Sequence, residues 1–299
     1  MRAVLASLMA PLLGCSSLLG IENPSAGDHR DGGVDAPDAP ASDHLVFSTG
    51  DFQLAQQQSV RVHVVFVHAN GTMEDVTQTA TYSSDNEAVV AIGGPGIINS
   101  VNAQSGTATI TATLGNALPA SVKATVKTTL CHPVINEFAT ATSASADEEW
   151  IEVYNPCTDP IDVAGWTLNY RGANTTGPTD SNGIVTLTGQ MAPGEIRLFG
   201  SMKYLGPKDG SWPSANGILG GTSGAIGLRS GATGSGTIVD SVGYGTVAAG
   251  NPFLEGTAAP AMSANVSASR SPFDGKDDDS GMLDFQITTA PTPRAPNAP

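Results

Sequence analysis

Gly106-Thr107-Ala108-Thr109-Ile110-Thr111-Ala112-Thr113-Leu114 is the stretch that decides the fold class of this chain. Apolar residues alternate with threonines through all of it, so that one face of the segment is apolar and the other is polar. Alternation with a period of two is typical of a half-buried β-strand, because successive side chains of a strand point to opposite faces. A helix would instead repeat its apolar residues three and four positions apart. The stretch therefore predicts one strand of a sheet that has a single buried face.

Shorter segments of the same kind surround this stretch. Residues 59–68 hold three valines and a phenylalanine at a period of two, and Asn70-Gly71 behind them supplies a hairpin turn. Residues 89–92 are a short apolar run, and residues 121–126 alternate again. Several short strands separated by turns are typical of a β-sandwich. We therefore expect a first β domain over residues 44–127.

The composition of the whole chain agrees with an all-β fold. The 299 residues include 35 glycines and 20 prolines, and only 14% are charged, which favours many short strands joined by turns. The 13 basic and 28 acidic residues give a net charge of −15, and no basic stripe is visible. Nucleic-acid binding requires such a basic surface, so we expect no nucleic-acid partner. The acidity instead favours solubility.

The N-terminus carries the features of an export signal. A short apolar segment follows Arg2 and ends at Cys15, and it is shorter than the roughly 20 residues that span a bilayer. Leu12-Leu13-Gly14-Cys15 resembles the lipobox of bacterial lipoproteins. The resemblance implies removal of residues 1–14, a lipid on Cys15 and, because Ser16 rather than aspartate follows, an outer-membrane location. An ordinary cleaved signal beside a chance cysteine, or a misplaced start codon, is the alternative.

A tether is expected behind the anchor. Residues 15–43 become rich in Asp, Pro, Gly and Ala from residue 22 onward, and they hold little apolar surface to bury. Such a segment is predicted to be disordered, with a root-mean-square span of about 30 Å. It would separate a lipid from the folded part of the chain.

The first expected domain resembles a known family. Asp75-Val76-Thr77, Ala80-Thr81-Tyr82-Ser83-Ser84-Asp85 and Gly106-Thr107-Ala108-Thr109-Ile110 are similar to segments of the bacterial immunoglobulin-like domain, group 2. Tyr82 departs from the pattern, since the family usually has a tryptophan there. The resemblance implies a spacer or adhesion module of surface proteins rather than an enzyme.

The remainder, residues 131–297, resembles the lamin tail domain. The similarity rests on the order of several apolar segments and a closing C-terminal stretch: 134–138, 149–156, 161–168, 191–199, 225–228, 238–245, 269–275, 284–285 and 291–293. The resemblance implies a second immunoglobulin-like β-sandwich, of a kind also found in exported bacterial proteins. We therefore expect an all-β chain with two sandwich domains in tandem.

Two cysteines remain once Cys15 is assigned to a lipid. An exported protein meets an oxidising compartment, so a disulfide between Cys131 and Cys157 is expected. If residues 134–138 and 150–155 form a hairpin, the two cysteines flank its open end. A bridge there would be worth about 3 kcal/mol. Zinc is not expected, because neither cysteine belongs to a CxxC pair.

Four glutamates lie close together in the expected hairpin: Glu137, Glu148, Glu149 and Glu152. Paired carboxylates about 5 to 10 Å apart can hydrolyse glycosides. The other interpretation makes Glu137 and Glu152 part of the fold's own motif and leaves the other two solvated at a turn. No cleft can be argued from the sequence, so we expect no catalytic residues.

An acidic loop near the C-terminus is a candidate cation site. Asp274, Asp277 and Asp279 offer hard oxygen ligands beside glycines, which suits Ca²⁺. Their spacing is not that of an EF-hand, and a solvated acidic loop is the alternative. No other cofactor is expected.

Trp212 is a candidate contact for a ligand. It lies in Asp209-Gly210-Ser211-Trp212-Pro213, a segment typical of a loop, and an exposed tryptophan can anchor a partner. A partly buried side chain that clamps the loop is the alternative. Trp150 and Trp166 are expected in the core.

These features favour a non-catalytic, lipid-anchored binding, adhesion or display protein of the bacterial cell envelope. The membrane is its expected partner through the anchor, and its ligand is a protein or a polysaccharide. The alternatives are an accessory module that positions a separate envelope enzyme and, least favoured, a hydrolase that uses the glutamates. The sequence leaves the oligomeric state open.

Overall fold

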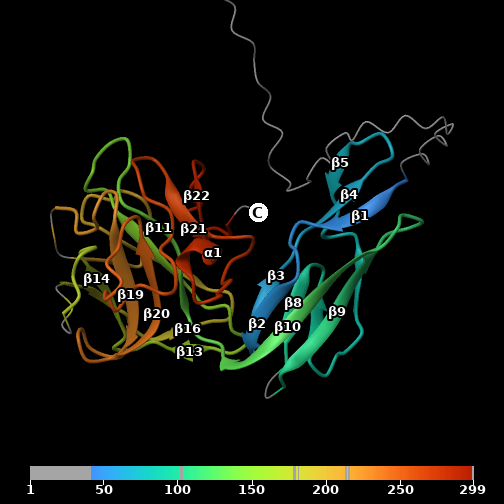
Figure 1. Cartoon of the computed structure of the whole chain (residues 1–299), viewed down its shortest axis with the longest axis horizontal. Coiled ribbons are helices and arrows are strands. Elements are labelled where there is room, and N and C mark those ends of the chain that lie inside the picture. Colours follow the sequence, from blue (N-terminus) through green and yellow to red (C-terminus); the bar gives the residue numbers. More distant parts are fainter. Residues whose placement is uncertain are drawn as a thin grey trace, which may run out of the picture. The chain divides into compact units, whose positions relative to one another are not determined.

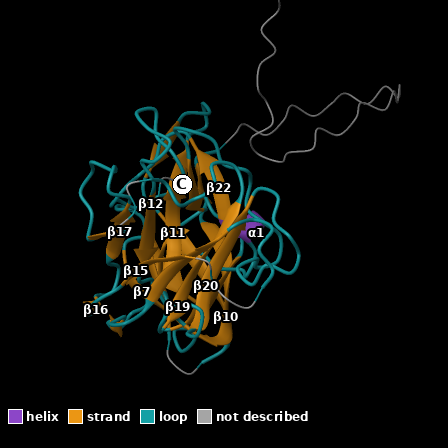
Figure 2. Cartoon of the chain, turned by 90° about the vertical axis from the view of Figure 1, so that its left-hand side faces the viewer, coloured by secondary structure: helices purple, strands orange, loops and turns teal. Residues whose placement is uncertain are grey.

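The regular secondary structure of the described residues is almost entirely β-strand, as expected (Figures 1 and 2). The computed structural model describes residues 42–101, 104–177, 180, 182–212, 214 and 216–297. The predicted signal peptide, Cys15 and the predicted tether through residue 41 lie outside these described residues. A four-residue helix, α1 (Gly281–Asp284), interrupts the strands. None of the helices in the described ranges has the length and apolar character needed to cross a membrane.

The N-terminal β region, residues 42–130, contains ten strands in three sheets. The first sheet has the order β1-β4-β5, the second β2-β10-β9-β6 and the third β3-β8-β7. The strands are β1 (His44–Phe47), β2 (Phe52–Gln56), β3 (Ser59–Arg61), β4 (Val64–Val67), β5 (Met73–Asp75), β6 (Thr81–Ser84), β7 (Val90–Gly94), β8 (Ile97–Ser100), β9 (Gly106–Thr113) and β10 (Ala120–Leu130).

The alternating stretch forms β9, as the sequence predicts. Its alanines and isoleucine are buried, with Ile110 fully so, whereas its threonines are exposed or half-buried. β9 pairs antiparallel with β10 on one side (Figure 1) and with β6 on the other. Its apolar face therefore packs into the hydrophobic core of the N-terminal β region.

The prediction of one continuous strand over residues 59–68 is wrong. The segment divides into β3, which pairs with β8, and β4, which pairs with β1 and β5. Between them, Val62 donates to the Gly96 carbonyl and the His63 carbonyl accepts from Ser48. The alternation of apolar residues is preserved, since Val62 and its valine neighbours are buried. The backbone nevertheless changes hydrogen-bonding partners, and this change left no sign in the side-chain pattern.

The predicted Asn-Gly turn joins β4 to β5. The His68 amide donates to the Thr72 carbonyl at 2.9 Å, and the Gly71 amide donates to the His68 carbonyl at 2.8 Å. Gly71 has a φ of +83°, in the left-handed region that a residue without Cβ adopts at little cost. The turn therefore uses the glycine as expected.

The C-terminal β region, residues 131–297, contains a six-stranded, a four-stranded and a two-stranded sheet. Their orders are β18-β17-β12-β11-β21-β22, β15-β14-β19-β20 and β13-β16. The strands are β11 (Val134–Ala139), β12 (Trp150–Tyr154), β13 (Ile161–Asp162), β14 (Thr167–Arg171), β15 (Asn182–Thr186), β16 (Gln190–Met191), β17 (Ile196–Gly200), β18 (Gly210–Ser211), β19 (Gly224–Ser230), β20 (Thr237–Tyr244), β21 (Ser267–Arg270) and β22 (Phe285–Thr288).

The expected hairpin is present in this region. β11 and β12 pair antiparallel, with Phe138 opposite Ile151 and Glu137 opposite Glu152. Trp150 is buried, and Trp166 is half-buried against the main core of the region. That core contains side chains from both large sheets, among them Ile135, Leu168 and Val242.

The two β regions share contacts and lie within one compact unit, residues 41–299. Phe273 of the C-terminal region belongs to the N-terminal core, where its ring meets Phe52 edge-on at 5.6 Å. Gln58 donates from Nε2 to the Gly275 carbonyl at 2.8 Å, and Ser59 donates from its amide to the Pro156 carbonyl. The predicted division into domains of residues 44–127 and 131–297 stays a prediction.

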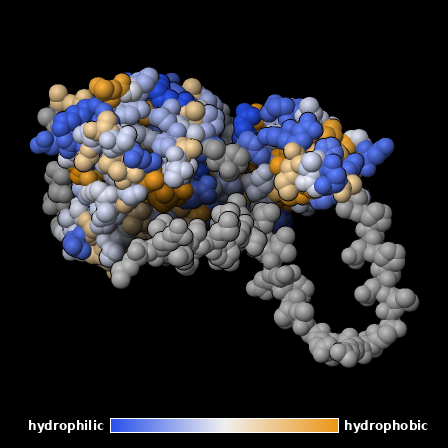
Figure 3. Space-filling model, turned by 90° about the horizontal axis from the view of Figure 1, so that it is seen from above, coloured by the Kyte–Doolittle hydropathy of each residue, from blue (hydrophilic) through white to orange (hydrophobic). Residues whose placement is uncertain are grey.

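The surface has no single chemical character. On the face drawn in Figure 3, small groups of hydrophobic residues lie among hydrophilic ones. The most exposed large apolar side chains are far apart in the sequence and include Leu205, Met73 and Leu130.

Candidate functional site

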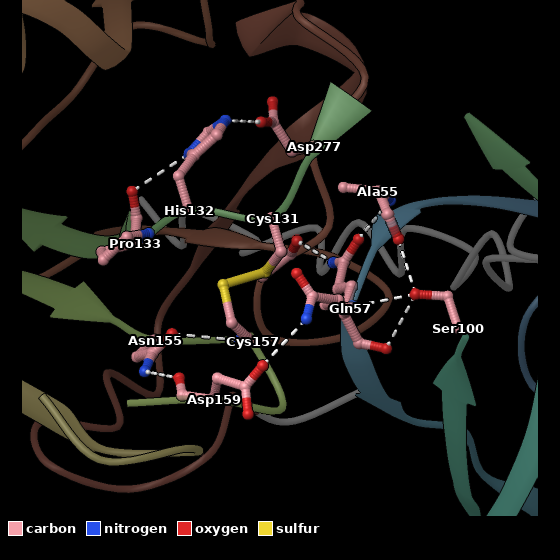
Figure 4. The surroundings of a disulfide bond; sticks show 12 residues. Ala55, Gln57, Ser100, Cys131, His132, Pro133, Asn155, Cys157, Asp159 and Asp277 are labelled. Carbon is pink, nitrogen blue, oxygen red and sulfur yellow. Dashed lines mark hydrogen bonds and ion pairs between the residues drawn. A yellow bond between two sulfur atoms is a disulfide. The ribbon is translucent and has the colours of Figure 1, made fainter. Parts of the chain in front are cut away.

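A disulfide joins Cys131 and Cys157 where β10 leads into the C-terminal β region (Figure 4). The two Cα atoms are 5.5 Å apart. The Cys131 amide donates to the Gln56 carbonyl at 2.9 Å, and Thr158, next to Cys157, donates to the Gln57 carbonyl at 2.7 Å. The bridge predicted from the sequence is therefore formed, and its backbone is bonded to the end of β2.

Glu137 and Glu152 face each other across the hairpin and are both fully buried. Glu137 accepts from the Thr292 amide at 3.1 Å, from the Thr292 hydroxyl at 2.8 Å and from the Ser267 hydroxyl. Oε1 of Glu152 accepts from the Arg294 amide, whereas Oε2 has no hydrogen-bond partner among the described residues. The segment after β22 thus covers both carboxylates.

Burial changes the protonation of this pair. Loss of hydration raises the pKa of Glu152 to about 8, with the charges of Glu137 and Asp274 adding to the effect. Burial also raises the pKa of Glu137, although its hydrogen bonds to Ser267 and Thr292 oppose the change. A raised pKa suits a general acid, but here the protonated carboxyl lies under the chain's own C-terminal segment.

The other two glutamates of the cluster separate from this pair. Glu149 is buried, and it accepts from the amides of Ile218 at 2.7 Å and Leu219 at 3.0 Å. The interpretation that left it solvated at a turn is therefore wrong. Desolvation raises its pKa to about 7. Glu148 is half-buried and accepts from the Thr142 hydroxyl.

The aspartates expected to hold Ca²⁺ are not brought together. Asp274 accepts from Asn136 Nδ2 at 2.7 Å. Asp277 lies 3.5 Å from the Arg270 guanidinium, and the largely exposed Asp279 lies 4.0 Å from Lys127. Each carboxylate therefore faces a different partner, and calcium binding by this set stays a prediction.

A different acidic group forms around Arg270. Carboxylate oxygens of Asp240, Glu255 and Asp277 lie within 4.8 Å of one another. The fully buried Arg270 guanidinium is 2.8 Å from Asp240 and 3.4 Å from Asp284, so it supplies positive charge to the group. Desolvation raises the pKa of Glu255 to about 9 and that of Asp240 to about 6.

Sequence reasoning missed this buried ion-pair network. Its members come from β20, the loop after β20, β21, the loop after β21 and α1. Asp240 and Glu255 have no other acidic residue beside them in the sequence. No short-range spacing signals such a group. An arginine within the closing segment, Arg270 in Ser269-Arg270-Ser271, is the sign that the sequence offers.

Trp212 is fully buried in the main core of the C-terminal region. Its backbone lies just after β18, outside any strand, as a loop residue should. The expectation of a surface contact with a ligand is wrong, because the apolar ring gains more from packing between the sheets than from exposure. Its indole N–H has no hydrogen-bond partner among the described residues.

Comparison with known proteins gives no family for this chain. No protein-family model matches it, and no curated protein matches it. A crystal structure of a DUF4876 family protein from Bacteroides thetaiotaomicron is similar with 11% identity and a TM-score of 0.35, over 82% of this chain and 92% of that one. Domains 5–6 of the S-layer protein SbsC are similar with 13% identity and a TM-score of 0.27, over 68% of this chain and 97% of that one. Likenesses this weak carry no argument about function.

Proposed function

We propose that this protein is a non-catalytic binding or display protein of the bacterial cell envelope. The observation that carries the proposal is the burial of Glu137 and Glu152. The hairpin carboxylates that a hydrolase would use are covered by Thr292 and Arg294 and hydrogen-bonded to the chain itself. Groups held in this way stabilise the closing segment and are not presented to a substrate.

The disulfide supports export. Disulfides persist in oxidising compartments and are rare in the cytosol, so the Cys131–Cys157 bridge agrees with a secreted or envelope protein. The lipobox-like Leu12-Leu13-Gly14-Cys15 adds the anchor to this proposal. A chain of this kind would hold its β regions away from a membrane by means of residues 15–43.

Mass spectrometry of the N-terminal peptide tests the anchor. We expect native protein extracted from membranes to yield a peptide that begins at Cys15 and carries acyl chains. The Cys15→Ala variant should lose the acyl chains and leave the membrane fraction. A peptide that begins elsewhere, or an unmodified Cys15, would contradict lipid anchoring and make a soluble secreted binder the better description.

A further inference from the structure

A groove with a volume of about 400 Å³ lies where the two β regions meet. Arg61 at the end of β3 and Asn99 in β8 line it from the N-terminal region. Tyr154 at the end of β12 and Asp274 line it from the C-terminal region. The size is within the range of small-molecule sites, and the groove is distinct from the buried glutamates.

Several polar groups at this groove keep hydrogen-bonding capacity that the fold does not use. Arg61 is exposed, and no ion pair in the described ranges includes it. Asn99 is half-buried at the groove, and no hydrogen bond of its side-chain amide is found among the residues that the structure describes. Its Oδ1 is closed to solvent, so Nδ2 is the atom that a ligand would meet. The Asp274 carboxylate accepts hydrogen bonds from Asn136 and Asn297, both through Oδ1. No hydrogen bond to its Oδ2 is found among the described residues. Unsatisfied groups of this kind favour a ligand that bonds to them.

Tyr154 adds a hydroxyl that keeps its proton. Desolvation and the nearby Asp274 charge raise the pKa of Tyr154 to about 12. The phenol can therefore both donate and accept at physiological pH. Ile97, Pro193 and Ile196 supply apolar wall beside these polar groups.

The charges at the groove point to a neutral ligand. Arg61 contributes one positive charge and Asp274 one negative charge, so their sum is close to zero. The whole chain carries −15, which repels polyanions at long range. A ligand with many hydroxyls needs donors and acceptors together, and the guanidinium, carboxylate, amide and phenol provide both.

We propose that this groove binds a neutral oligosaccharide. Hydroxyls of the sugar would bond to Arg61, Asn99 and Asp274, and the C–H faces of the rings would pack on the apolar wall. This inference rests on the proposed function, because it assigns a ligand class to a non-catalytic binding protein.

Isothermal titration calorimetry with purified full-length protein tests the proposal. The probes are cellotetraose, mannotetraose, maltotetraose and chitotetraose, with tetragalacturonate as the charged comparator. We expect saturable one-to-one binding of at least one neutral tetrasaccharide and none of the galacturonate. Arg61→Gln and Asn99→Ala should each raise the Kd about tenfold, the effect of one good hydrogen bond to a charged or buried group.

Lys123→Gln is the matched control for Arg61→Gln. Lys123 is an exposed cation in β10 and does not line the groove, so its replacement removes the same charge and should leave the Kd unchanged. Circular dichroism should show all three variants folded. Absence of binding by every neutral tetrasaccharide, or affinities that both groove variants leave unchanged, would overturn the inference.

The same samples separate this inference from the proposed function. Mass spectrometry of the sugar after incubation should show its original length. Shortened products would contradict the non-catalytic function while groove binding could still be measured. Conversely, an acylated Cys15 together with no binding of any neutral sugar would remove the groove inference and leave envelope display in place.

Discussion

Glu152 makes the stability of this protein depend on pH in an uncommon direction. The pKa of its buried carboxyl is raised to about 8, above the ordinary value of 4.5. The folded state therefore holds a proton that the unfolded state releases once the pH exceeds about 4.5. The stabilising effect of this proton is complete below that pH, and it is lost as the pH rises through about 8.

Glu152→Gln should remove most of this dependence. Glutamine stays neutral at every pH and keeps an oxygen for the Arg294 amide. We expect the free energy of unfolding of the variant to exceed that of the natural protein by about 1–3 kcal/mol at pH 8 and to differ little from it at pH 5. In a chain of this size, a change of about 1 kcal/mol in the free energy of unfolding shifts Tm by about 2–4 °C. Thermal unfolding followed by circular dichroism between pH 5 and pH 9 measures the difference.

Glu87→Gln is the control for this substitution. Glu87 is exposed in the N-terminal β region, so Glu87→Gln should leave the pH profile of unfolding like that of the natural protein. Equal profiles for Glu152→Gln and the natural protein would show that Glu152 is ionised in the folded state.

At single positions, the sequence predicts a contact when a residue type has few possible partners. Cys131 and Cys157 were predictable because export and an even number of thiols left one pairing. The burial of Trp212 and of Glu149 was not, because it depends on distant parts of the chain: the core between the sheets for Trp212, and the amides of Ile218 and Leu219 for Glu149. The Asp240–Arg270 pair joins residues thirty positions apart, and no local pattern encodes that contact.

At the scale of elements, the disulfide closes the β11–β12 hairpin at its open end. Its cysteines are 26 residues apart. Replacement of both by serine should lower the free energy of unfolding by about 3 kcal/mol, because the unfolded chain regains the entropy that the bridge removes. Urea denaturation at constant pH measures the loss.

Reduction of the natural protein is the internal control for this substitution. Dithiothreitol should destabilise it by about the same amount, and it should have no effect on the double serine variant. Equal stability of oxidised and reduced protein would mean that the bridge does not constrain the unfolded chain.

Elements with a regular side-chain pattern were predictable in place and partner. β9 follows from strict alternation, and β11 with β12 follows from two apolar segments around a turn. The division of residues 59–68 into β3 and β4 was not predictable, because alternation reports which face is buried and not which strand accepts the hydrogen bonds. The same limit applies to the parallel pairing of β2 with β10.

For the whole molecule, Phe273 links the two β regions through packing. It is 3% exposed and belongs to the N-terminal core, although it is encoded near the C-terminus. Phe273→Ala should lower the free energy of unfolding by about 3–5 kcal/mol, and the N-terminal region should lose the most stability. We expect scanning calorimetry to show one transition for the natural protein and two for the variant.

Phe253→Ala is the comparison for this experiment. Phe253 is equally buried, but its neighbours Arg171, Arg229 and Gly227 all belong to the C-terminal region. Its loss should lower stability by a similar amount and keep a single transition. Two transitions in both variants would show that Phe273 has no special part in coupling the regions.

The parallel pairing of β2 with β10 has a mechanical consequence. Phe52 pairs with Ala124 and Leu54 with Val126, so the two strands run in the same direction. A pull on the N-terminal side of β2 and on the C-terminal side of β10 acts along the strands in opposite senses. All the hydrogen bonds between β2 and β10 then bear the force together in shear, instead of breaking one after another from one end. The β2–β10 pairing would therefore resist a stretching force that is applied to these two strands.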